Sequence, residues 1–155
     1  MNKIKAIFLN IGLLAISFII AWLLLRFDKV FLDLANYRSS LWISIGVIVI
    51  IVGLVIRLWA SYTFYSHGLK VLALKPQHQI VQSGPYKYSR NPLYIGIILI
   101  FLGWVLFLGS NIGLVTVAIL AVLFHLDLIL SGEKELEQKF GEEYRQYKLN
   151  VPRWL

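Results

Sequence analysis

The chain has 155 residues, of which 59% are hydrophobic and only 15% are charged, and it contains no cysteine. This apolar share exceeds what a soluble domain needs to fill one core, so the composition predicts an integral membrane protein. The lack of cysteine excludes disulfide bonds, thiolate zinc sites and cysteine nucleophiles. The net charge of +7 is explained by cationic loops beside anionic lipid headgroups, so nucleic acid is not an expected partner.

The first apolar run covers residues 6–25 and contains no charged residue. As a helix it measures about 30 Å, which matches the hydrocarbon thickness of a bilayer. Lys3 and Lys5 precede the run, so a cleavable signal peptide is the alternative interpretation. The apolar part is too long for such a peptide and no small-x-small cleavage site follows it, which favours a transmembrane helix.

The second run, residues 41–63, is uncharged until Arg57. A charge in the middle of a membrane helix costs about 2.5 to 3.5 kcal/mol on insertion scales. Arg57 is therefore expected either to extend to the inner surface or to pair with Asp127, which the pattern places near the inner end of its own helix. We expect its role to be structural.

Residues 93–126 form a third apolar run, which as one helix would measure about 51 Å and is too long for a single crossing. Gly109, Ser110 and Asn111 are its turn-like residues. The run is expected to fold into two helices, residues 93–108 and 112–130, joined as a tight hairpin. Gly96 and Gly103 would share one face of the first of these helices and permit close approach of a neighbouring helix.

The sequence thus predicts one all-α membrane domain, residues 1–155, with about four transmembrane helices. With four crossings, the N-terminus, the loop at 66–92 and the C-terminal tail lie on one side of the membrane. These segments hold eleven of the 15 lysines and arginines, whereas the opposite side holds Arg26, Lys29 and Arg38. Because cations are retained in the cytoplasm, both termini are expected there, at the inner membrane of a prokaryote.

After residue 131 the composition changes from apolar to strongly charged. The spacing of Leu136, Phe140, Tyr144 and Tyr147 predicts one amphipathic cytoplasmic helix, which lies either along the membrane surface or against the core. Glu133 falls on the same inward stripe, so its carboxylate is expected to face the protein. It either binds a cationic ligand group or interacts only with the helix dipole.

The loop sequence SGPYKYSRNPLYIG, residues 83–96, combines tyrosines, cations and prolines. The prolines block a continuous helix, so this segment is expected to lie at the interface or against protein. Pro92 is suited to the first position of the next helix. Lys87 and Arg90 are interpreted either as anchors at the membrane surface or as binding groups for an anion.

Known fingerprints for soluble nucleotide-binding and metal-binding folds, such as GxGxxG, GxxxxGK[ST] and HExxH, do not occur in the sequence. His67, His78 and His125 lack the spacing of metal ligands, so we expect no metal site. Any cofactor site must be built in another way.

Two segments, GPYKYSRNPLYIG and EKELEQKFGEEYRQYKLNVPRWL, together resemble the isoprenylcysteine carboxyl methyltransferase and phospholipid methyltransferase superfamily of membrane enzymes. The resemblance covers residues 71–155 and involves two motifs in the same order as in the family. It implies S-adenosylmethionine as the cofactor, held at the cytoplasmic membrane face, and a lipophilic acceptor that enters from the surrounding lipid. It carries no information on oligomeric state.

By this resemblance, Arg90 and Glu133 are the catalytic candidates, and Glu133 would meet the amino group of the cofactor. The residues implied in cofactor binding are His78, Val81, Gly84, Pro85, Tyr86, Tyr88, Arg90, Asn91, Pro92, Tyr94 and Glu133. The tyrosines in this set would contact the adenine or the sulfonium by stacking or cation–π attraction.

The chain departs from the family motif at two positions. Asn91 stands where histidine is frequent, and Gly132 where many relatives have the first of two glutamates. Without an imidazole at position 91, a role that needs a titrating base is disfavoured, and so is prenylcysteine as the substrate. The acceptor is left open among a lipid carboxylate, a phospholipid amine and other lipids. Two other classes are a nicotinamide-dependent enzyme similar to sterol reductases and a non-enzymatic membrane assembly protein.

Overall fold

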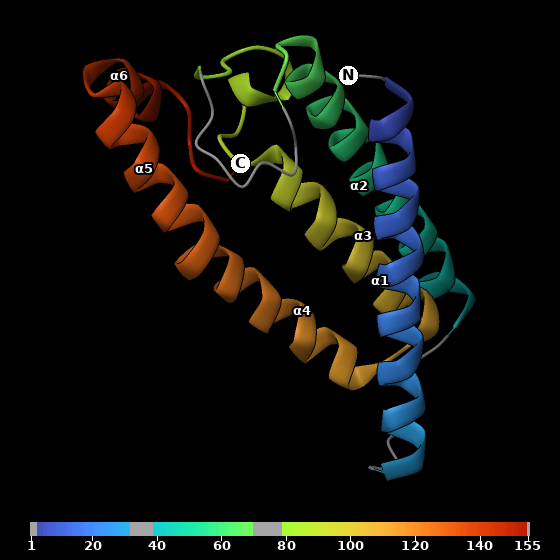
Figure 1. Cartoon of the computed structure of the whole chain (residues 1–155). Helices are drawn as coiled ribbons and strands as arrows, with labels where there is room; N and C mark the ends of the chain where they lie inside the picture. Colours follow the sequence, from blue (N-terminus) through green and yellow to red (C-terminus); the bar gives the residue numbers. More distant parts are fainter. Residues whose placement is uncertain (1–2, 32–38, 70–78, 155) are drawn as a thin grey trace.

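Figure 1 shows the computed structural model of the chain, which describes residues 3–31, 39–69 and 79–154. Regular structure in these ranges is helical, and they contain no strand, so the all-α prediction is confirmed. The elements in chain order are α1 (Lys3–Phe31), α2 (Ser40–Ser66), the 3-10 helix η1 (Gly84–Lys87), α3 (Pro92–Leu108), α4 (Asn111–Leu123), the π-helix η2 (Phe124–Ile129), α5 (Leu130–Phe140) and α6 (Glu142–Asn150).

Within the described residues, three helical stretches are long and apolar enough to cross a bilayer. They are Phe8–Phe31, Ser40–Ser66 and Asn111–Phe140. The apolar helix α3 has 17 residues, or about 25 Å, which is shorter than the hydrocarbon thickness. The chain is therefore an integral membrane protein, and a fourth crossing by α3 stays a prediction.

The helices α2 and α3 touch through their backbones, because glycines stand where they meet. A Cβ atom at Gly46 would lie 2.7 Å from the carbonyl oxygen of Gly103, and one at Gly96 would lie 2.6 Å from Cβ of Arg57. Small residues allow such close contact between membrane helices, so the role predicted for Gly96 and Gly103 is confirmed. The contact fixes Arg57 relative to the start of α3.

A carboxylate from α1 holds the turn between α3 and α4. Gly109 ends α3 with a φ of 76°, and the hydroxyl of Ser110 accepts a hydrogen bond from the amide of Gly113 (3.0 Å). Asp28, which is 1% exposed, accepts hydrogen bonds from the Ser110 hydroxyl (2.6 Å) and the Ile112 amide (3.1 Å). The helix break falls at the expected residues. The ribbons of α3 and α4 separate away from the turn (Figure 1), and their arrangement as a membrane hairpin stays a prediction.

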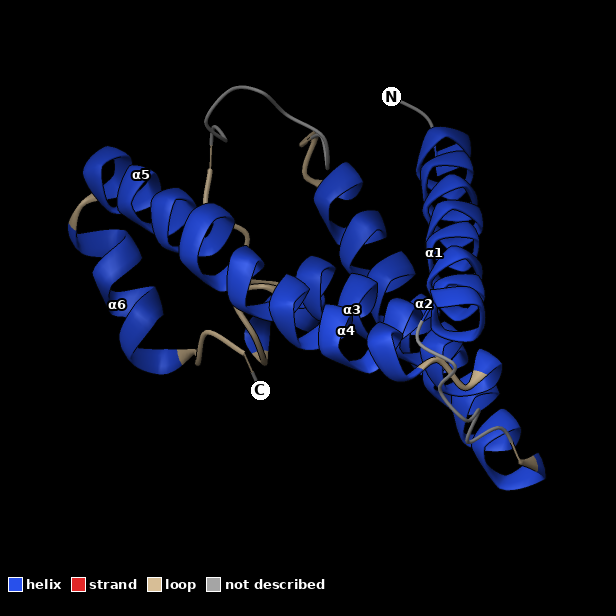
Figure 2. Cartoon of the chain, turned by 90° about the horizontal axis from the view of Figure 1, so that it is seen from below, coloured by secondary structure: helices blue, strands red, loops and turns tan. Residues whose placement is uncertain are grey.

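The boundary expected at residue 130 is wrong, because α4, η2 and α5 continue as one helical stretch, Asn111–Phe140. No proline interrupts this stretch, and Gly132 inside it costs only about 1 kcal/mol of helix stability. The chain bends instead at Gly141, whose φ of 54° suits glycine alone. The expected single amphipathic helix is therefore divided into α5 and α6, and α6 folds back beside α5 (Figure 2).

The predicted apolar stripe still packs together across this bend, because α6 returns toward the core. The resulting cluster contains Ile80, Leu136, Phe140, Tyr144, Tyr147 and Val151. Figure 1 places the start of α1, the end of α2, η1, α5 and α6 at one end of the molecule. This end contains the residues that the sequence singles out for chemistry.

Candidate functional site

The loop before α3 is fixed on α2 by a glycine and an aromatic pair. Gly84 has a φ of 58°, and a Cβ atom there would lie 2.6 Å from the hydroxyl oxygen of Thr63, so glycine is required at this position. Pro85 follows at the start of η1, and the ring of Tyr86 packs on Phe64 with centroids 5.0 Å apart. This turn sets the direction in which the chain approaches α3.

Two tyrosines join α6 to the same loop. The hydroxyl of Tyr147 donates a hydrogen bond to the backbone carbonyl of Tyr86 (2.8 Å), and both side chains are buried. Burial raises the pKa of both hydroxyl groups above the ordinary value and raises the pKa of Tyr144 to about 12. These side chains therefore stay neutral and link the elements by hydrogen bonding and packing.

Next to this link, Glu133 of α5 lies between two arginines. Glu133 is 6% exposed, and Arg153 donates to both of its oxygens, from Nε to Oε1 (3.0 Å) and from Nη2 to Oε2 (2.9 Å). Nη2 of Arg90 lies 3.2 Å from Oε1 of Glu133. The hydrogen bonds to Glu133 raise the pKa of Arg153. The two catalytic candidates are thus in direct contact, and the three residues form what we term the ion cluster.

The segment that follows α6 lies along the residues before α3. The backbone N–H of Arg90 donates to the carbonyl of Pro152 (3.0 Å). The Ser89 hydroxyl and the Asn91 side-chain amide both donate to the carbonyl of Arg153, at 3.2 and 3.1 Å. Three hydrogen bonds therefore join this segment to the loop beside the ion cluster.

We refer to residues 151–154 as the strap. At one end Val151 is buried with Tyr144 in the apolar cluster of α5 and α6. At the other end the ring of Trp154 stacks on His125 of η2, with centroids 6.2 Å apart. The strap therefore extends from α6 to η2 and passes over the ion cluster.

Arg90 keeps two buried nitrogen atoms, Nε and Nη1, for which the described residues provide no hydrogen-bond partner. The ion cluster combines two guanidinium groups with one carboxylate, so its formal charge is positive. Unpaired buried donors on a cation are costly. Because Cδ lies between Nε and Nη1 at the edge of the guanidinium group, each of the two nitrogens would need an acceptor of its own, and a ligand carboxylate would satisfy one of them. An ammonium group beside Glu133 would complete the binding of an α-amino acid.

Arg57 is a second buried cation, in the C-terminal half of α2. Its side chain is 2% exposed, and Nη1 donates to the carbonyl of Leu93 in the first turn of α3 (2.8 Å). Within the part of the chain that the structure describes, Nε of Arg57 and the buried hydroxyl of Tyr86 lack hydrogen-bond partners. The side chain of Asp127, the expected partner, lies outside the described part. Arg57 therefore binds a backbone carbonyl through Nη1, and its buried Nε has no partner among the described residues.

The predicted cofactor residues divide according to their surroundings. Arg90 and Glu133 meet in the ion cluster, and Asn91 reaches it through the carbonyl of Arg153. The packed frame of the loop contains five further members of the set: Val81, Gly84, Pro85, Tyr86 and Pro92.

Three predicted residues lie elsewhere or are not described. Tyr88 is 62% exposed, and its ring centroid lies 6.4 Å from that of Trp59. Tyr94, in α3, pairs with Phe124 of η2 at 5.4 Å. His78 lies outside the described residues. Their contacts with a cofactor stay predictions.

No pattern in the sequence identifies Arg153 as a partner of Glu133. The two residues are 20 positions apart and on different sides of the bend at Gly141, so no helical period relates them. Pro152 indicates that the last helix has ended, but it does not indicate where the next residue binds. The hydrogen bond of Ser89 to the carbonyl of Arg153 could not be predicted either, because no sequence period relates the two residues. The same holds for the stack of Trp154 on His125.

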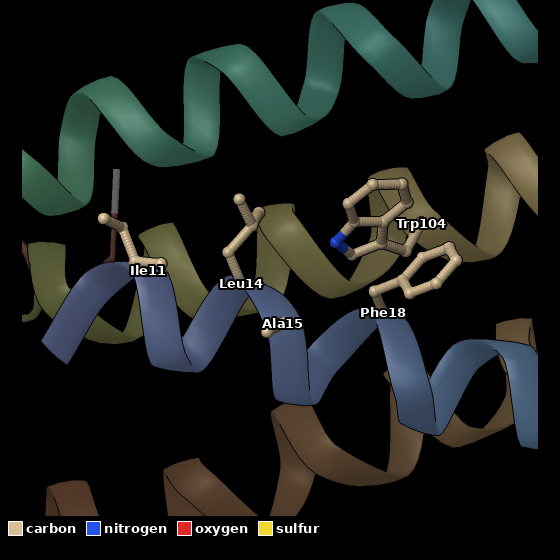
Figure 3. A pocket seen from close by; sticks show the side chains of 5 residues that line it. All are labelled: Ile11, Leu14, Ala15, Phe18 and Trp104. Carbon is tan, nitrogen blue, oxygen red and sulfur yellow. The ribbon is translucent and has the colours of Figure 1, made fainter. Parts of the chain in front are cut away.

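Figure 3 shows an apolar hollow between α1 and α3, and no residue that lines it belongs to the ion cluster. Its volume is about 260 Å³. Its lining consists of Ile11, Leu14, Ala15, Phe18 and Trp104. With no charged group in this lining, the hollow is suited to hydrocarbon and not to chemistry.

Comparison with known proteins supplies the context for this site. Protein-S-isoprenylcysteine O-methyltransferase B of Arabidopsis thaliana is 30% identical over 119 residues, which are 74% of this chain and 60% of that protein. The human protein-S-isoprenylcysteine O-methyltransferase is 29% identical over 135 residues, which are 85% of this chain and 47% of that protein. An uncharacterised protein of Haemophilus influenzae is 41% identical over 63 residues, which are 41% of this chain and 100% of that protein.

The chain thus spans about half of the length of the two named methyltransferases. The family model for phospholipid methyltransferase matches residues 41–143, which is more than half of the chain. This region includes Arg57, Arg90 and Glu133, whereas Asp28 and Arg153 lie outside it. The chain belongs to the phospholipid methyltransferase family of membrane proteins.

Proposed function

We propose that the protein is a methyltransferase that uses S-adenosylmethionine and acts on a lipophilic substrate at the cytoplasmic membrane surface. The observation that carries the proposal is the contact between Arg90 and Glu133, which come from two separate motifs of the family. A buried carboxylate paired with a buried arginine that has free donors is uncommon unless a ligand uses it. The names of the curated relatives support methyl transfer as the reaction.

The ion cluster fits the amino-acid end of this cofactor, which carries one carboxylate and one ammonium group. We expect one of the two unpartnered nitrogens of Arg90, Nε or Nη1, to donate to the carboxylate and Glu133 to accept from the ammonium group. A hydrogen bond between a guanidinium group and a carboxylate is charge-assisted and therefore stronger than a neutral one. When bound, the cofactor supplies a methyl group activated by a sulfonium.

We assign Arg57 to the methyl acceptor. Its free Nε and the free hydroxyl of Tyr86 are both buried donors, so together they suit an anionic group at the membrane boundary. The acceptor that fits is a lipid carboxylate, which is ionised at neutral pH and needs no general base. Asn91 donates its amide to the carbonyl of Arg153 and is no proton acceptor, which disfavours an amine substrate.

The contribution of the chain to catalysis would be orientation and the exclusion of water. The backbone contact of α2 with α3 at Gly96 fixes Arg57, and the buried loop fixes Arg90. Correct placement of donor and acceptor removes much of the entropic part of the barrier. Because a sulfonium and a carboxylate lose charge as the methyl group is transferred, a site shielded from water favours the reaction.

The topology that we propose has four crossings in a single domain, with α3 as the third crossing. The loop that carries Arg90 and the helix that carries Glu133 would face the cytoplasm, together with both termini, at a prokaryotic inner membrane. The concentration of lysine and arginine in these segments supports this orientation.

Cofactor binding by the purified protein in lipid nanodiscs tests the proposal. S-adenosylmethionine and S-adenosylhomocysteine are expected to raise the melting temperature, since a ligand at one hundred times its Kd adds about 2.7 kcal/mol of stability. Glu133→Gln is expected to weaken binding by roughly tenfold or more, because the ammonium group loses a charged partner. The matched control is Glu143→Gln, at an exposed position of α6, which should bind normally.

Methyl transfer is followed with cofactor labelled in the methyl group and a membrane lipid extract as the acceptor pool. A carboxylate acceptor yields a methyl ester, whose label is released by mild base. If the label enters lipid but resists mild base, the acceptor is an amine or a carbon atom and not a carboxylate. A nicotinamide cofactor that raises the melting temperature, together with no rise from S-adenosylmethionine, would overturn the proposal itself.

A further inference from the structure

We propose that the strap is a gate on the cofactor site, in which the Arg153 guanidinium holds Glu133 and is exchanged for the ammonium group of the cofactor. This inference rests on the proposed function, because it concerns the same carboxylate. It assigns a role to the strap, residues 151–154, for which the sequence offers no indication.

Arg153 occupies the acceptor atoms that the ammonium group requires. It donates to both carboxylate oxygens of Glu133, at 3.0 and 2.9 Å, and Arg90 approaches Oε1 as well, at 3.2 Å. Both carboxylate oxygens therefore already accept a hydrogen bond from Arg153, and Oε1 also lies in an ion pair with Arg90. A third cation at this buried group meets repulsion from the two that are present.

Withdrawal of Arg153 balances the charges of the site. Arg90 and Glu133 would then face the carboxylate and the ammonium group of the ligand, one charge to each. With Arg153 retained, the same ligand would lie in a buried cluster that has an additional positive charge, and a like charge in a poorly solvated site disfavours a cationic ligand. The exchange removes this penalty.

Arg153 and Arg90 differ in exposure and in their unpaired donors, and an exchange of Arg153 for a ligand requires both differences. The side chain of Arg153 is 31% exposed, whereas the side chains of Arg90 and Glu133 are both 8% exposed. Arg153 uses its bonding nitrogens on Glu133, while Arg90 keeps two buried donors for which the described residues provide no partner. Arg90 is therefore built to hold a ligand, and Arg153 is placed where it can turn out to water.

The strap is anchored at one end by burial and is held along the rest of its length by polar and ring contacts. Val151 is buried in the cluster of α5 and α6, which anchors the strap to the body of the protein. Beyond it the contacts are the two bonds of Arg153 to Glu133, three hydrogen bonds from residues 89–91 and the stack of Trp154 on His125. When residues 152–154 swing away, the side-chain amide of Asn91 is also released for the cofactor.

The first test measures binding of S-adenosylhomocysteine to Arg153→Gln by calorimetry in nanodiscs. Removal of a competing, partly exposed ion pair is expected to tighten binding by about fivefold. If Arg153 instead orients Glu133 or holds the cofactor itself, binding weakens. Arg145→Gln is the matched control, because Arg145 lies on α6 and pairs with Glu137, and its affinity should equal that of the wild type.

The second test locks the strap in place. The chain contains no cysteine, so the pair His125→Cys and Trp154→Cys replaces the stack, whose rings are 6.2 Å apart, with two thiols for a short bis-methanethiosulfonate linker. Cross-linked protein is expected to lose at least tenfold in affinity and to recover it after reduction. Equal affinity in the linked and reduced forms excludes the gate. Each single-cysteine variant treated with the reagent is the control.

These measurements separate the gate from the proposed function. Wild-type protein that binds neither the cofactor nor its product contradicts the proposed function, and the gate is then rejected with it. Wild-type protein that binds both, while Arg153→Gln gains nothing and the linker has no effect, contradicts the gate alone. Melting temperatures without ligand establish that the variants are folded.

Discussion

Asp28 and Glu133 are the carboxylates that are buried among the described residues, and their partners give them different roles. Asp28 accepts from neutral donors, the Ser110 hydroxyl and the Ile112 amide, at the first turn of α4. Glu133 accepts from two cations. A carboxylate at a helix N-terminus stabilises unpaired amides and the helix dipole, so Asp28 is structural, whereas a cation can replace another cation at Glu133.

The role of Asp28 leads to a prediction at the residue scale. Asp28→Ala is expected to lower the free energy of unfolding by about 2 to 3 kcal/mol, because it leaves a buried hydroxyl and a helix amide without their acceptor. Asp28→Asn keeps one acceptor oxygen and should cost less. Reversible unfolding in mixed micelles measures both variants, and equal stability of Asp28→Ala and the wild type would show that the capping is unimportant.

At the scale of elements, the contact between α2 and α3 determines how the site is built. The glycines of α2 lie against the backbone of α3, and those of α3 lie against α2. A side chain between the two backbones would move the helices apart, and with them Arg57 and the loop that leads into α3. The geometry of the acceptor and cofactor sites therefore depends on residues that contact neither ligand.

Gly96→Ala tests this dependence. The new Cβ atom would lie 2.6 Å from Cβ of Arg57 and 2.9 Å from the carbonyl oxygen of Gly53, so the helices must separate, at an expected cost of about 1 to 3 kcal/mol. The control is Gly12→Ala in α1, where a Cβ atom meets nothing within 4 Å. Thermal unfolding in nanodiscs should show a loss for Gly96→Ala alone. Alanine favours a helix over glycine by about 1 kcal/mol, so a gain of equal size in both variants would mean that helix propensity outweighs crowding at Gly96.

Features that depend on neighbours in the sequence could be predicted, and features that depend on distant residues could not. The apolar runs, the turn at Gly109 and the inward direction of Glu133 all follow from local hydropathy and helical period. The continuation of the helix through Gly132 was missed, because no local rule distinguishes a glycine inside a helix from one at its end. The bond of Arg153 to Glu133 depends on the fold of α6 across Gly141, which sequence spacing does not encode.

For the whole molecule, the central question is how α3 lies in the membrane. It is an apolar helix of 17 residues and begins beside the ion cluster. If α3 crosses fully, the turn that starts α4 reaches the outer surface, and α5 returns the chain to the side of Arg90. The contact of Arg90 with Glu133 requires this return, whatever the depth of the turn.

Single-cysteine labelling measures the topology directly, because the chain has no cysteine of its own. We expect a membrane-impermeant maleimide applied from outside to label cysteines at Leu41 and Asn111, and one applied from inside to label cysteines at Lys87 and Glu143. Labelling of Asn111→Cys from neither side would mean that α3 ends within the bilayer. Labelling of Lys87→Cys from outside would reverse the proposed orientation.

The π-helix η2, Phe124–Ile129, affects the direction in which the side chains of α5 point around the helix axis. A π turn accommodates one more residue than the α-helical ladder, and each residue of an α-helix advances the side-chain direction by about 100°. Deleting one residue from η2 would let the π turn become an α turn and would leave the direction of later side chains nearly unchanged, whereas deleting one from the α-helical residues just before Glu133 would carry its carboxylate about a quarter of a turn around the axis and away from Arg90, with every charged group still present. The number of α-helical residues before Glu133, counted to a single residue, therefore decides whether the two halves of the site face each other.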